Sequence, residues 1–412
     1  MKVPAGFTFS TAKTVGIKVS TLNNQDQPVP GIRINILSDY PENGGVRIVS
    51  GMTDAQGVFS LDYRVPALYD SLVVGTTALG FTNFQKVKIS GGALACVLGG
   101  KHEPSNFKSS DGGVYKSGTG NFYPMVTYNA LGVPSYLMPV NDVVENSMIQ
   151  DINATLPEYG SLPTTHPQYF LSTNEPNLVL NEACDVWVTF IHEGAGYKNV
   201  LGYYRYNTNN PPATTTAIDS IHIIFPNISY LNSGGGLTSG NKVHLGIFPP
   251  GTELAWVLIA DGFQNGTITS GRGVFYSDKE LNPEPNPGLK KHTILCNDIG
   301  RGKFLLSFED IRRDGGSDND FNDAVFYVTA SPITAVNTAN VPLPNYTQSD
   351  TDGDGVSDNF DDYPNDATKA FNNFYPEQDP YGTLVFEDMW PQMGDYDCND
   401  MVINYRMNQI TN

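Results

Sequence analysis

An acidic stretch at residues 350–361 has the spacing of a calcium-binding loop. Carboxylates stand at loop positions 1, 3, 5, 9 and 12, which are Asp350, Asp352, Asp354, Asp358 and Asp361. Alternating side chains converge when the backbone curls around a cation, and the carbonyl oxygen of Val356 at position 7 adds another hard ligand. Gly355 at position 6 permits a sharp turn that a side chain would obstruct. The pattern predicts a Ca²⁺ site, and the alternative is a solvated acidic linker.

The residues on either side of this loop argue against a helix–loop–helix calcium motif. No amphipathic helical pattern flanks the loop, Pro342 and Pro344 precede it, and Pro364 follows it. Proline disfavours a continuous helix on either side. The stretch resembles a thrombospondin type 3-like calcium repeat, and that resemblance implies a brace between neighbouring domains.

A second acidic pattern occurs twice in the chain. In each copy, a strand ending in Phe-Glu-Asp is followed by a DxDxND loop that leads into another strand. The first copy supplies Glu309, Asp310, Asp318, Asp320, Asn322 and Asp323, and the second supplies Glu387, Asp388, Asp395, Asp397, Asn399 and Asp400. A hairpin would bring these oxygen donors together, where carboxylates repel without a cation and suit Ca²⁺. The alternative is that Asn322 and Asp323 cap turns while the acids are solvated.

The charge of the chain is concentrated in one region. The net charge is −19 over 412 residues, and residues 308–400 contain 20 acidic and 3 basic side chains, a net charge of −17. This distribution favours cation binding and argues against nucleic acid or an anionic membrane as a partner. The sequence has no apolar run of about 18 residues, so no transmembrane segment is expected.

The first hundred residues predict a β-sandwich. Short runs that alternate apolar and polar residues are separated by turn clusters, as expected for seven or eight strands. Residues 1–100 resemble transthyretin-like or carboxypeptidase-regulatory-like modules, whose TDxxGxF turn is matched at residues 53–59, and we expect a transthyretin/Ig-like spacer domain. Residues 101–121, rich in Gly and Ser, are expected to form a flexible linker.

The rest of the chain predicts a second sandwich, a connector and a further β domain. Continuous apolar runs between residues 122 and 335 favour a jelly-roll-like sandwich. Its single helix is expected near residues 142–156, capped by Asn141 and carrying an apolar stripe of Val144, Met148, Ile152 and Leu156. Residues 336–380 are expected to form the calcium-binding connector. Residues 381–412 are expected to begin a C-terminal β domain that the chain truncates.

Catalytic patterns are mostly missing. His192 and Glu193 begin a metalloprotease-like HExxH, but Gly196 stands where the second His is required. No GxSxG or phosphate-binding glycine loop is present, and the six His are not clustered. Paired carboxylates could hydrolyse glycosides, but one of them must then be a general acid whose pKa is raised by an apolar pocket. Acids interleaved as DxDxND are instead spaced to share one cation. A glycoside hydrolase is therefore the less favoured alternative.

Two further residue types leave alternatives open. The tyrosines at positions 197, 203, 204 and 206 could form a sugar-binding platform, although alternate side chains of one strand would also pack inward. The four widely spaced cysteines at positions 96, 184, 296 and 398 favour isolated thiols over a disulfide framework.

The N-terminus has no apolar signal segment. We therefore expect that the protein is either cytosolic or has had an export signal removed from this sequence.

Taken together, the acidic motifs resemble those of LruC-domain proteins. The resemblance rests on the duplicated FED…DxDxND pattern, the DTDGDGVSDNFDDYPND loop, and residues 153–158, 190–197 and 201–204, and it covers roughly residues 130–405. It implies an exported, lipoprotein-like surface protein of Bacteroidetes or other bacteria, with calcium association, an adhesion-type role and no established activity. Proteins of this kind usually continue well beyond the second FED motif, whereas this chain stops at Asn412.

The sequence thus predicts a mainly β, multi-domain, non-enzymatic protein that binds Ca²⁺ at the cell surface or in secreted form. Calcium would make the acidic connector and hairpins rigid, and the function would be adhesion or assembly through a glycan or protein ligand. The expected location is extracellular or on the outer membrane surface, with a lipid anchor carried by a removed signal. The alternatives are a carbohydrate-binding module of a bacterial surface glycan system and a glycoside hydrolase.

Overall fold

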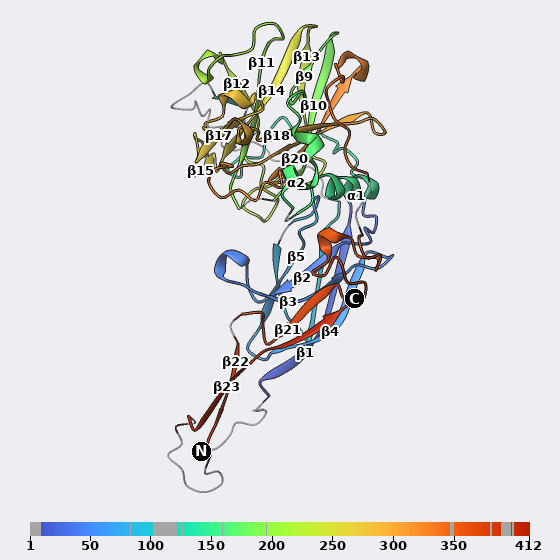
Figure 1. The fold of residues 1–412 in the computed structure, drawn as a ribbon, viewed down its shortest axis with the longest axis vertical. Coiled ribbons are helices and arrows are strands. Elements are labelled where there is room, and N and C mark those ends of the chain that lie inside the picture. Colours follow the sequence, from blue (N-terminus) through green and yellow to red (C-terminus); the bar gives the residue numbers. More distant parts are fainter. Residues whose placement is uncertain are drawn as a thin grey trace.

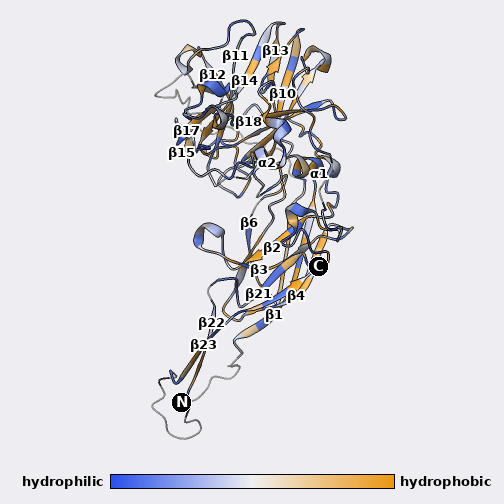
Figure 2. Cartoon of the chain, viewed as in Figure 1, coloured by the Kyte–Doolittle hydropathy of each residue, from blue (hydrophilic) through white to orange (hydrophobic). Residues whose placement is uncertain are grey.

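The computed structural model describes residues 10–82, 84–101, 122–124, 127–158, 160–194, 196–346, 350–379, 381–388, 397 and 399–412. These residues form a mainly β protein with several separate sheets, as predicted. Figure 1 shows an elongated molecule with one sandwich above the other and two helices between them. Hydrophobic residues follow the strands of both sandwiches (Figure 2). Most of the predicted linker, residues 102–121, lies outside the described residues.

The N-terminal sandwich has seven strands in two sheets. One sheet has the order β4-β1-β7 and the other β3-β2-β5-β6. The strands are β1 (Ala12–Leu22), β2 (Arg33–Leu37), β3 (Arg47–Met52), β4 (Val58–Pro66), β5 (Ser71–Gly75), β6 (Phe84–Lys88) and β7 (Ala93–Gly99). Alternation in β1 buries Val15, Ile17 and Val19 between the sheets. The seven strands match the predicted number.

The central sandwich packs a five-stranded sheet against a six-stranded one. The sheets have the orders β13-β10-β20-β19-β18 and β17-β14-β11-β12-β8, with β9 beside β14 and a separate pair, β15 and β16. The strands are β8 (Phe122–Pro124), β9 (Leu178–Val179), β10 (Cys184–Glu193), β11 (Val200–Asn207), β12 (Ile221–Phe225), β13 (Lys242–Phe248), β14 (Thr252–Ala260), β15 (Phe263–Gln264), β16 (Thr267–Ile268), β17 (Gly273–Tyr276), β18 (Thr293–Asp298), β19 (Lys303–Phe308) and β20 (Ala324–Ser331). Between the sheets, Phe190 contacts Phe225 and Phe326 edge to face.

Helix α1 (Asn146–Thr155) lies at the junction of the two sandwiches, and the short α2 (Leu162–Thr165) follows it (Figure 1). The predicted apolar stripe is buried, and it belongs to a hydrophobic cluster that also contains core residues of both sandwiches. Asn153 accepts a hydrogen bond at 2.9 Å from the backbone N–H of Leu79. The predicted cap is wrong. The helix begins after Glu145, and Asn141 instead accepts a hydrogen bond from Asn241 because the central sandwich offers it a partner.

Replacing Ile152 by alanine is expected to destabilise the protein by about 2–5 kcal/mol, because the side chain is fully buried at this junction and truncation leaves a cavity. Chemical denaturation monitored by fluorescence measures the loss. The matched control is Val143→Ala, since Val143 is 48% exposed and should change the midpoint little. Equal effects for the two variants would contradict the buried position of the helix.

In the described residues, part of the segment after the central sandwich is attached to the N-terminal sandwich. Strands β21 (Phe371–Tyr375) and β24 (Met407–Thr411) pair with each other, and β21 lies against β3 of the N-terminal sandwich. The backbone N–H of Ser50 donates to the side-chain oxygen of Asn373 at 3.0 Å. The predicted domain boundary near residue 381 therefore differs from the structure, because buried apolar side chains such as Phe371 attach this segment to the first sandwich.

One hairpin projects away from both sandwiches. Strands β22 (Gly382–Phe386) and β23 (Met401–Tyr405) pair antiparallel and extend beyond the N-terminal sandwich, on the side away from the central sandwich (Figure 1). Its side chains of Leu384, Val385 and Val402 are more than 40% exposed. Among the described residues, Cys96, Cys184 and Cys296 are free thiols, and no helix is long and apolar enough to cross a membrane.

Candidate metal centres

The first copy of the acidic motif is a hairpin at the ends of β19 and β20. Phe308 pairs with Ala324 in the ladder, and the loop between them contains all the acidic residues. The backbone N–H of Asp310 donates to the Asp323 carboxylate at 2.8 Å, which closes the base of the loop. Asn319 and Phe321 have φ values of 64° and 60°, so two left-handed residues turn the chain sharply at the DxDxND segment. The predicted hairpin is confirmed.

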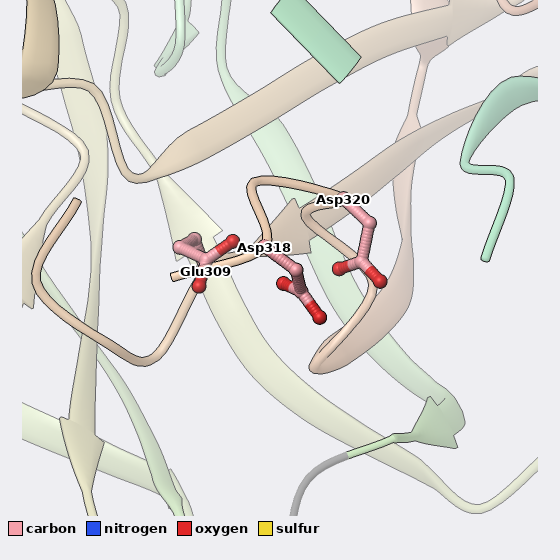
Figure 3. A group of neighbouring side chains, drawn as sticks. All are labelled: Glu309, Asp318 and Asp320. Atoms are coloured by element: carbon pink, nitrogen blue, oxygen red, sulfur yellow. The ribbon is translucent and has the colours of Figure 1, made fainter. Parts of the chain in front are cut away.

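Three carboxylates meet in this loop. One oxygen from each of Glu309, Asp318 and Asp320 lies within 4.8 Å of the others. Figure 3 shows Glu309 at the end of one strand and the two aspartates side by side on the loop. Glu309 and Asp320 are 1% and 2% exposed, whereas Asp318 is open to solvent. Within the part of the chain that the structure describes, no Lys, Arg or His forms a salt bridge with these acids, and Glu309 Oε2 is buried without a hydrogen-bond partner.

Burial makes ionisation of this cluster unfavourable. It raises the pKa of Glu309 to about 8, with further contributions from the charges of Asp318 and Asp320. Burial and Asp318 raise the pKa of Asp320 to about 7. The pKa of Asp310 rises to about 6 through burial, and that of Asp323 lies well above its ordinary value through burial and the charge of Asp310. A bound divalent cation would offset this desolvation and repulsion.

The other predicted residues of the first motif lie beside the triad and are held by hydrogen bonds. Asp310 accepts a bond at 2.6 Å from Asn199, and the Asn322 amide donates at 3.0 Å to Glu158. The motif therefore brings three of its five acids close together, while Asp310 and Asp323 connect the loop to the strands. The residue before β11 and the segment after α1 supply these partners.

Sequence reasoning missed two acids beside this centre. Glu158 follows α1, and burial together with the Asp320 charge raises its pKa to about 8. Glu193 at the end of β10 is 2% exposed, and burial followed by the Asp310 charge raises its pKa well above its ordinary value. Both lie in stretches noted for other reasons, the helix end and the incomplete HExxH, but nothing in their local spacing connects them with a loop near residue 320.

Calcium affinity at this centre is expected to rise by about tenfold per pH unit between pH 6 and 8 for each proton released, since bound Ca²⁺ requires ionised carboxylates. In the cation-free protein, Glu309 holds a proton that the unfolded chain releases near pH 4.5, so the unfolding free energy falls as the pH rises from about 4.5 to 8. Titration calorimetry in buffers of different ionisation enthalpy measures the released protons. Binding without proton release at pH 6.5 would contradict the prediction.

The connector loop also gathers three carboxylates. One oxygen from each of Asp350, Asp352 and Asp354 lies within 4.8 Å of the others. The backbone N–H of Gly355 donates to Asp350 at 3.1 Å, and φ at this glycine is 95°, the left-handed turn that the sequence required. The N–H of Val356 donates to Asp354 at 2.8 Å. The backbone therefore curls around the carboxylates, as expected for a cation loop.

Three carboxylate oxygens of this loop are buried without a hydrogen-bond partner among the described residues. They are one Oδ2 atom each of Asp352, Asp354 and Asp361. Burial, with the nearby charges of Asp354 and Asp352, raises the pKa of Asp361. Asp358 behaves differently, because both of its oxygens accept bonds at 2.7 Å from Thr351, and it does not join the triad. The loop thus gathers three of its five acids, and Asp361 lies near enough for the charges of two of them to raise its pKa.

The second copy of the acidic motif has the same hairpin geometry. Phe386 pairs with Met401 in the ladder, and the N–H of Asp388 donates to the Asp400 carboxylate at 2.9 Å, as Asp310 does to Asp323 in the first copy. Oxygens of Glu387, Asp388 and Asp400 lie within 4.8 Å of one another. Asp397 accepts bonds from Asn399, and Asp395 lies outside the described residues. In the described part of the chain, β22 and β23 form a two-stranded sheet of their own, and Asp388 and Asp400 are exposed while Glu387 is half-buried.

The tyrosines do not form an exposed platform. Tyr203 and Tyr204 are 6% and 0% exposed, and Tyr204 donates from its hydroxyl to Asp278 at 2.7 Å. Tyr203 contacts His222 and Phe248 instead. The alternative, in which alternate tyrosines pack inward, is only partly right: both neighbours are buried, because Tyr203 and Tyr204 on opposite faces of β11 pack into two different hydrophobic clusters.

Comparisons with known proteins assign no activity to these sites. Residues 248–331 match a domain of unknown function, DUF4114, and residues 13–98 match another, DUF8469. The first match contains the buried acidic hairpin and the second contains the N-terminal sandwich, but neither spans half of the chain. The search of curated proteins found no match. The resemblance to LruC-domain proteins and to thrombospondin type 3-like repeats stays a prediction.

One solved structure shows weak similarity. A 9R-lipoxygenase from Cyanothece PCC8801 is 9% identical with a TM-score of 0.17, and the alignment covers 66% of this chain and 43% of the lipoxygenase chain. The chain thus spans less than half the length of that enzyme. A TM-score of this size does not establish a common fold, and the lipoxygenase supports no conclusion about function.

Proposed function

We propose that this protein binds Ca²⁺ at the buried hairpin centre and at the connector loop, and that the bound ions stabilise the arrangement of its two sandwiches. The observation that carries the proposal is a set of buried carboxylate oxygens without hydrogen-bond partners in the described chain, Glu309 Oε2 in the hairpin and three Oδ2 atoms in the connector. A buried, unpaired carboxylate oxygen is costly, and a cation removes that cost. Oxygen-only donors favour Ca²⁺ over zinc or copper.

The two centres border one cleft at the junction of the sandwiches. The cleft, about 530 Å³ in volume, is lined by Glu158 from the hairpin centre and by Asp358 and Asp361 from the connector. Its other wall includes Arg33 and Arg47 of the N-terminal sandwich. Occupied centres would reduce repulsion across this cleft, so calcium would act as a mechanical brace between the two domains.

The proposed biological role is that of a non-enzymatic, cell-surface or secreted protein in adhesion or assembly. Support comes from the resemblance of its acidic motifs to LruC-domain proteins and from the need of weak calcium sites for extracellular ion concentrations. The acids of the hairpin converge on one point and hydrogen-bond to backbone and amide groups, as structural ligands do. A bound glycan or protein would be presented by the rigid pair of sandwiches.

Calorimetric titration of chelator-treated protein with Ca²⁺ tests the proposal. We expect saturable binding, loss of the connector site alone in Asp352→Asn and loss of the hairpin site alone in Asp320→Asn. Mutation of a residue that only orients a metal ligand typically lowers metal affinity about 10–100-fold, and loss of a ligand itself should lower the calcium affinity of its site at least as much. Glu182→Gln is the matched control, because Glu182 is exposed between β9 and β10. Absence of binding heat in the unmodified protein would overturn the proposal.

A further inference from the structure

A separate polar pocket lies on the central sandwich. Its volume is about 660 Å³, within the range of pockets that hold small ligands, about 300–1,000 Å³. Polar side chains of Asn177, Tyr206, Glu253 and Asp278 line one part of it. Apolar groups of Phe170, Leu171, Pro211, Pro212 and Leu281 line another part. None of these residues belongs to either acidic loop, so the pocket is independent of the proposed calcium centres.

A compact hydrogen-bond network forms the polar wall. The Asn177 amide nitrogen lies 2.8 Å from Glu253 Oε1 and 2.7 Å from Asp278 Oδ1. The Tyr206 hydroxyl lies 2.6 Å from the same Glu253 oxygen and 3.0 Å from the same Asp278 oxygen. Tyr204 donates to the other oxygen of Asp278 from the protein interior. The strands and loops therefore hold two carboxylates in fixed positions around one amide group.

Acceptors outnumber donors in this wall. Asn177 is 1% exposed, and its side-chain oxygen has no hydrogen-bond partner among the residues that the structure describes. In the same set of residues, neither Glu253 nor Asp278 forms a salt bridge. Glu175, a third carboxylate of the pocket, has a pKa raised to about 7 by burial and by the charges of Glu253 and Asp278. The wall is negatively charged and poor in donors.

Two lysines line the pocket, Lys279 and Lys291, and in the described chain neither forms a salt bridge with Glu253 or Asp278; Lys279 is exposed to solvent. Lys291 lines the pocket, but its ammonium group donates to the backbone oxygen of Tyr169 and lies over the ring of Phe170. Burial lowers the pKa of Lys291 to about 8. The wall therefore leaves one unpartnered acceptor, Asn177 Oδ1, and two carboxylates without a salt bridge in the described chain for a ligand to satisfy.

We propose that this pocket binds a primary ammonium group carried on an apolar stem. An ammonium group offers three N–H donors and one positive charge, which match the acceptors and the charge of the Glu253–Asp278 wall. The stem would lie along the apolar side chains of the pocket, as lysine stems do on apolar surfaces. A neutral sugar would supply donors but would leave both carboxylate charges uncompensated.

Two sources share this chemistry, a lysine side chain of a polypeptide and a small free amine. Titration of the calcium-saturated full-length chain with Nα-acetyl-lysine methylamide and with n-butylamine distinguishes them. Tighter binding of the lysine amide indicates a polypeptide ligand, and equal or tighter binding of butylamine indicates a small amine. The Nε-acetylated lysine amide is the neutral probe, and we expect it to bind at least about tenfold more weakly, because it loses the charge-assisted bonds.

Variants locate the binding site. Asp278→Asn and Glu253→Gln are expected to weaken the lysine amide about tenfold each, since each removes one carboxylate from the wall that would face the ammonium group. Thr208→Trp fills the pocket without altering the network, and it keeps the test valid if Asp278→Asn disturbs the hydrogen bond from Tyr204. Glu182→Gln is again the control.

Several outcomes would overturn the inference. They are equal affinity for the charged and acetylated lysine probes, binding of glucose but of neither amine, and unchanged binding of the lysine amide by Thr208→Trp. Because the pocket shares no residue with the acidic loops, each titration is repeated in chelator. If the protein binds the amine but not calcium, the proposed function is contradicted and this inference stands. If it binds calcium but not the amine, this inference is contradicted and the proposed function stands.

Discussion

Saturating Ca²⁺ is expected to raise the unfolding free energy of the chelator-treated protein by about 2.7 kcal/mol per site, at a free concentration of 100 times the Kd. The physical reason is that the ion binds the folded loops, where Glu309 and Asp354 hold buried unpaired oxygens, and has little affinity for the unfolded chain. Thermal unfolding at several calcium concentrations measures this gain as a rising midpoint.

The direction in which one substitution shifts the unfolding midpoint distinguishes specific calcium binding from a general effect of salt. Asp320→Asn removes a buried negative charge beside Asp318 and Glu309, so it should raise the midpoint of the cation-free protein. In saturating Ca²⁺ the same variant should unfold at a lower temperature than the unmodified protein, since one site is lost. Glu182→Gln should change neither midpoint. A midpoint that rises equally with NaCl and CaCl₂ at matched ionic strength would contradict specific binding.

Replacing Asp362 by asparagine is expected to destabilise the protein by about 3 kcal/mol, near the value for loss of one partner from a buried ion pair. Asp362 is 16% exposed and forms salt bridges of 2.9 Å with both Arg33 and Arg47. Its loss removes the carboxylate that faces both guanidinium groups, while Arg33, which is also mostly buried, keeps its hydrogen bond of 2.7 Å to the carbonyl of Phe360. Denaturant unfolding measures the change, and limited proteolysis shows whether the connector has detached.

The control for this prediction is Asp39→Asn in the same sandwich. Asp39 also forms a salt bridge, with Lys86, but both side chains are more than a third exposed. Solvent screens such a pair, so its loss should change the unfolding midpoint little. If the Asp362 and Asp39 variants behave alike, the connector is not attached to the N-terminal sandwich through the arginine pair.

The acidic connector and the acidic hairpin both lie at the junction of the two sandwiches. Val356 and Phe360 of the connector are buried in the same cluster as residues of α1 and of both sandwiches. The hairpin centre reaches the same junction through Glu158, which hydrogen-bonds Asn322 and lines the cleft. An ion at either centre would therefore act on the contacts between domains.

Local sequence patterns determined the strands, the turns and the repeated hairpins. Alternation of apolar residues places Val15, Ile17 and Val19 inside the first sandwich, since side chains of a strand alternate between its faces. Gly355 takes the left-handed conformation that a cation loop needs at this position. The duplicated FED…DxDxND pattern forms the same hairpin twice, with equivalent backbone bonds from Asp310 and Asp388. Each of these features depends on residues close together in the chain.

Only the tertiary structure decided which acids share a site and which are buried. Glu158 and Glu193 join the hairpin centre from positions more than a hundred residues away, and no local spacing signals such a contact. The two copies of the hairpin differ in burial because the central sandwich covers Glu309, whereas the second hairpin projects from the molecule (Figure 1). The connector attaches to the first sandwich through long-range pairs such as Arg33 with Asp362. Burial and long-range pairing arise from the packing of distant segments, and they set the electrostatics of the proposed sites.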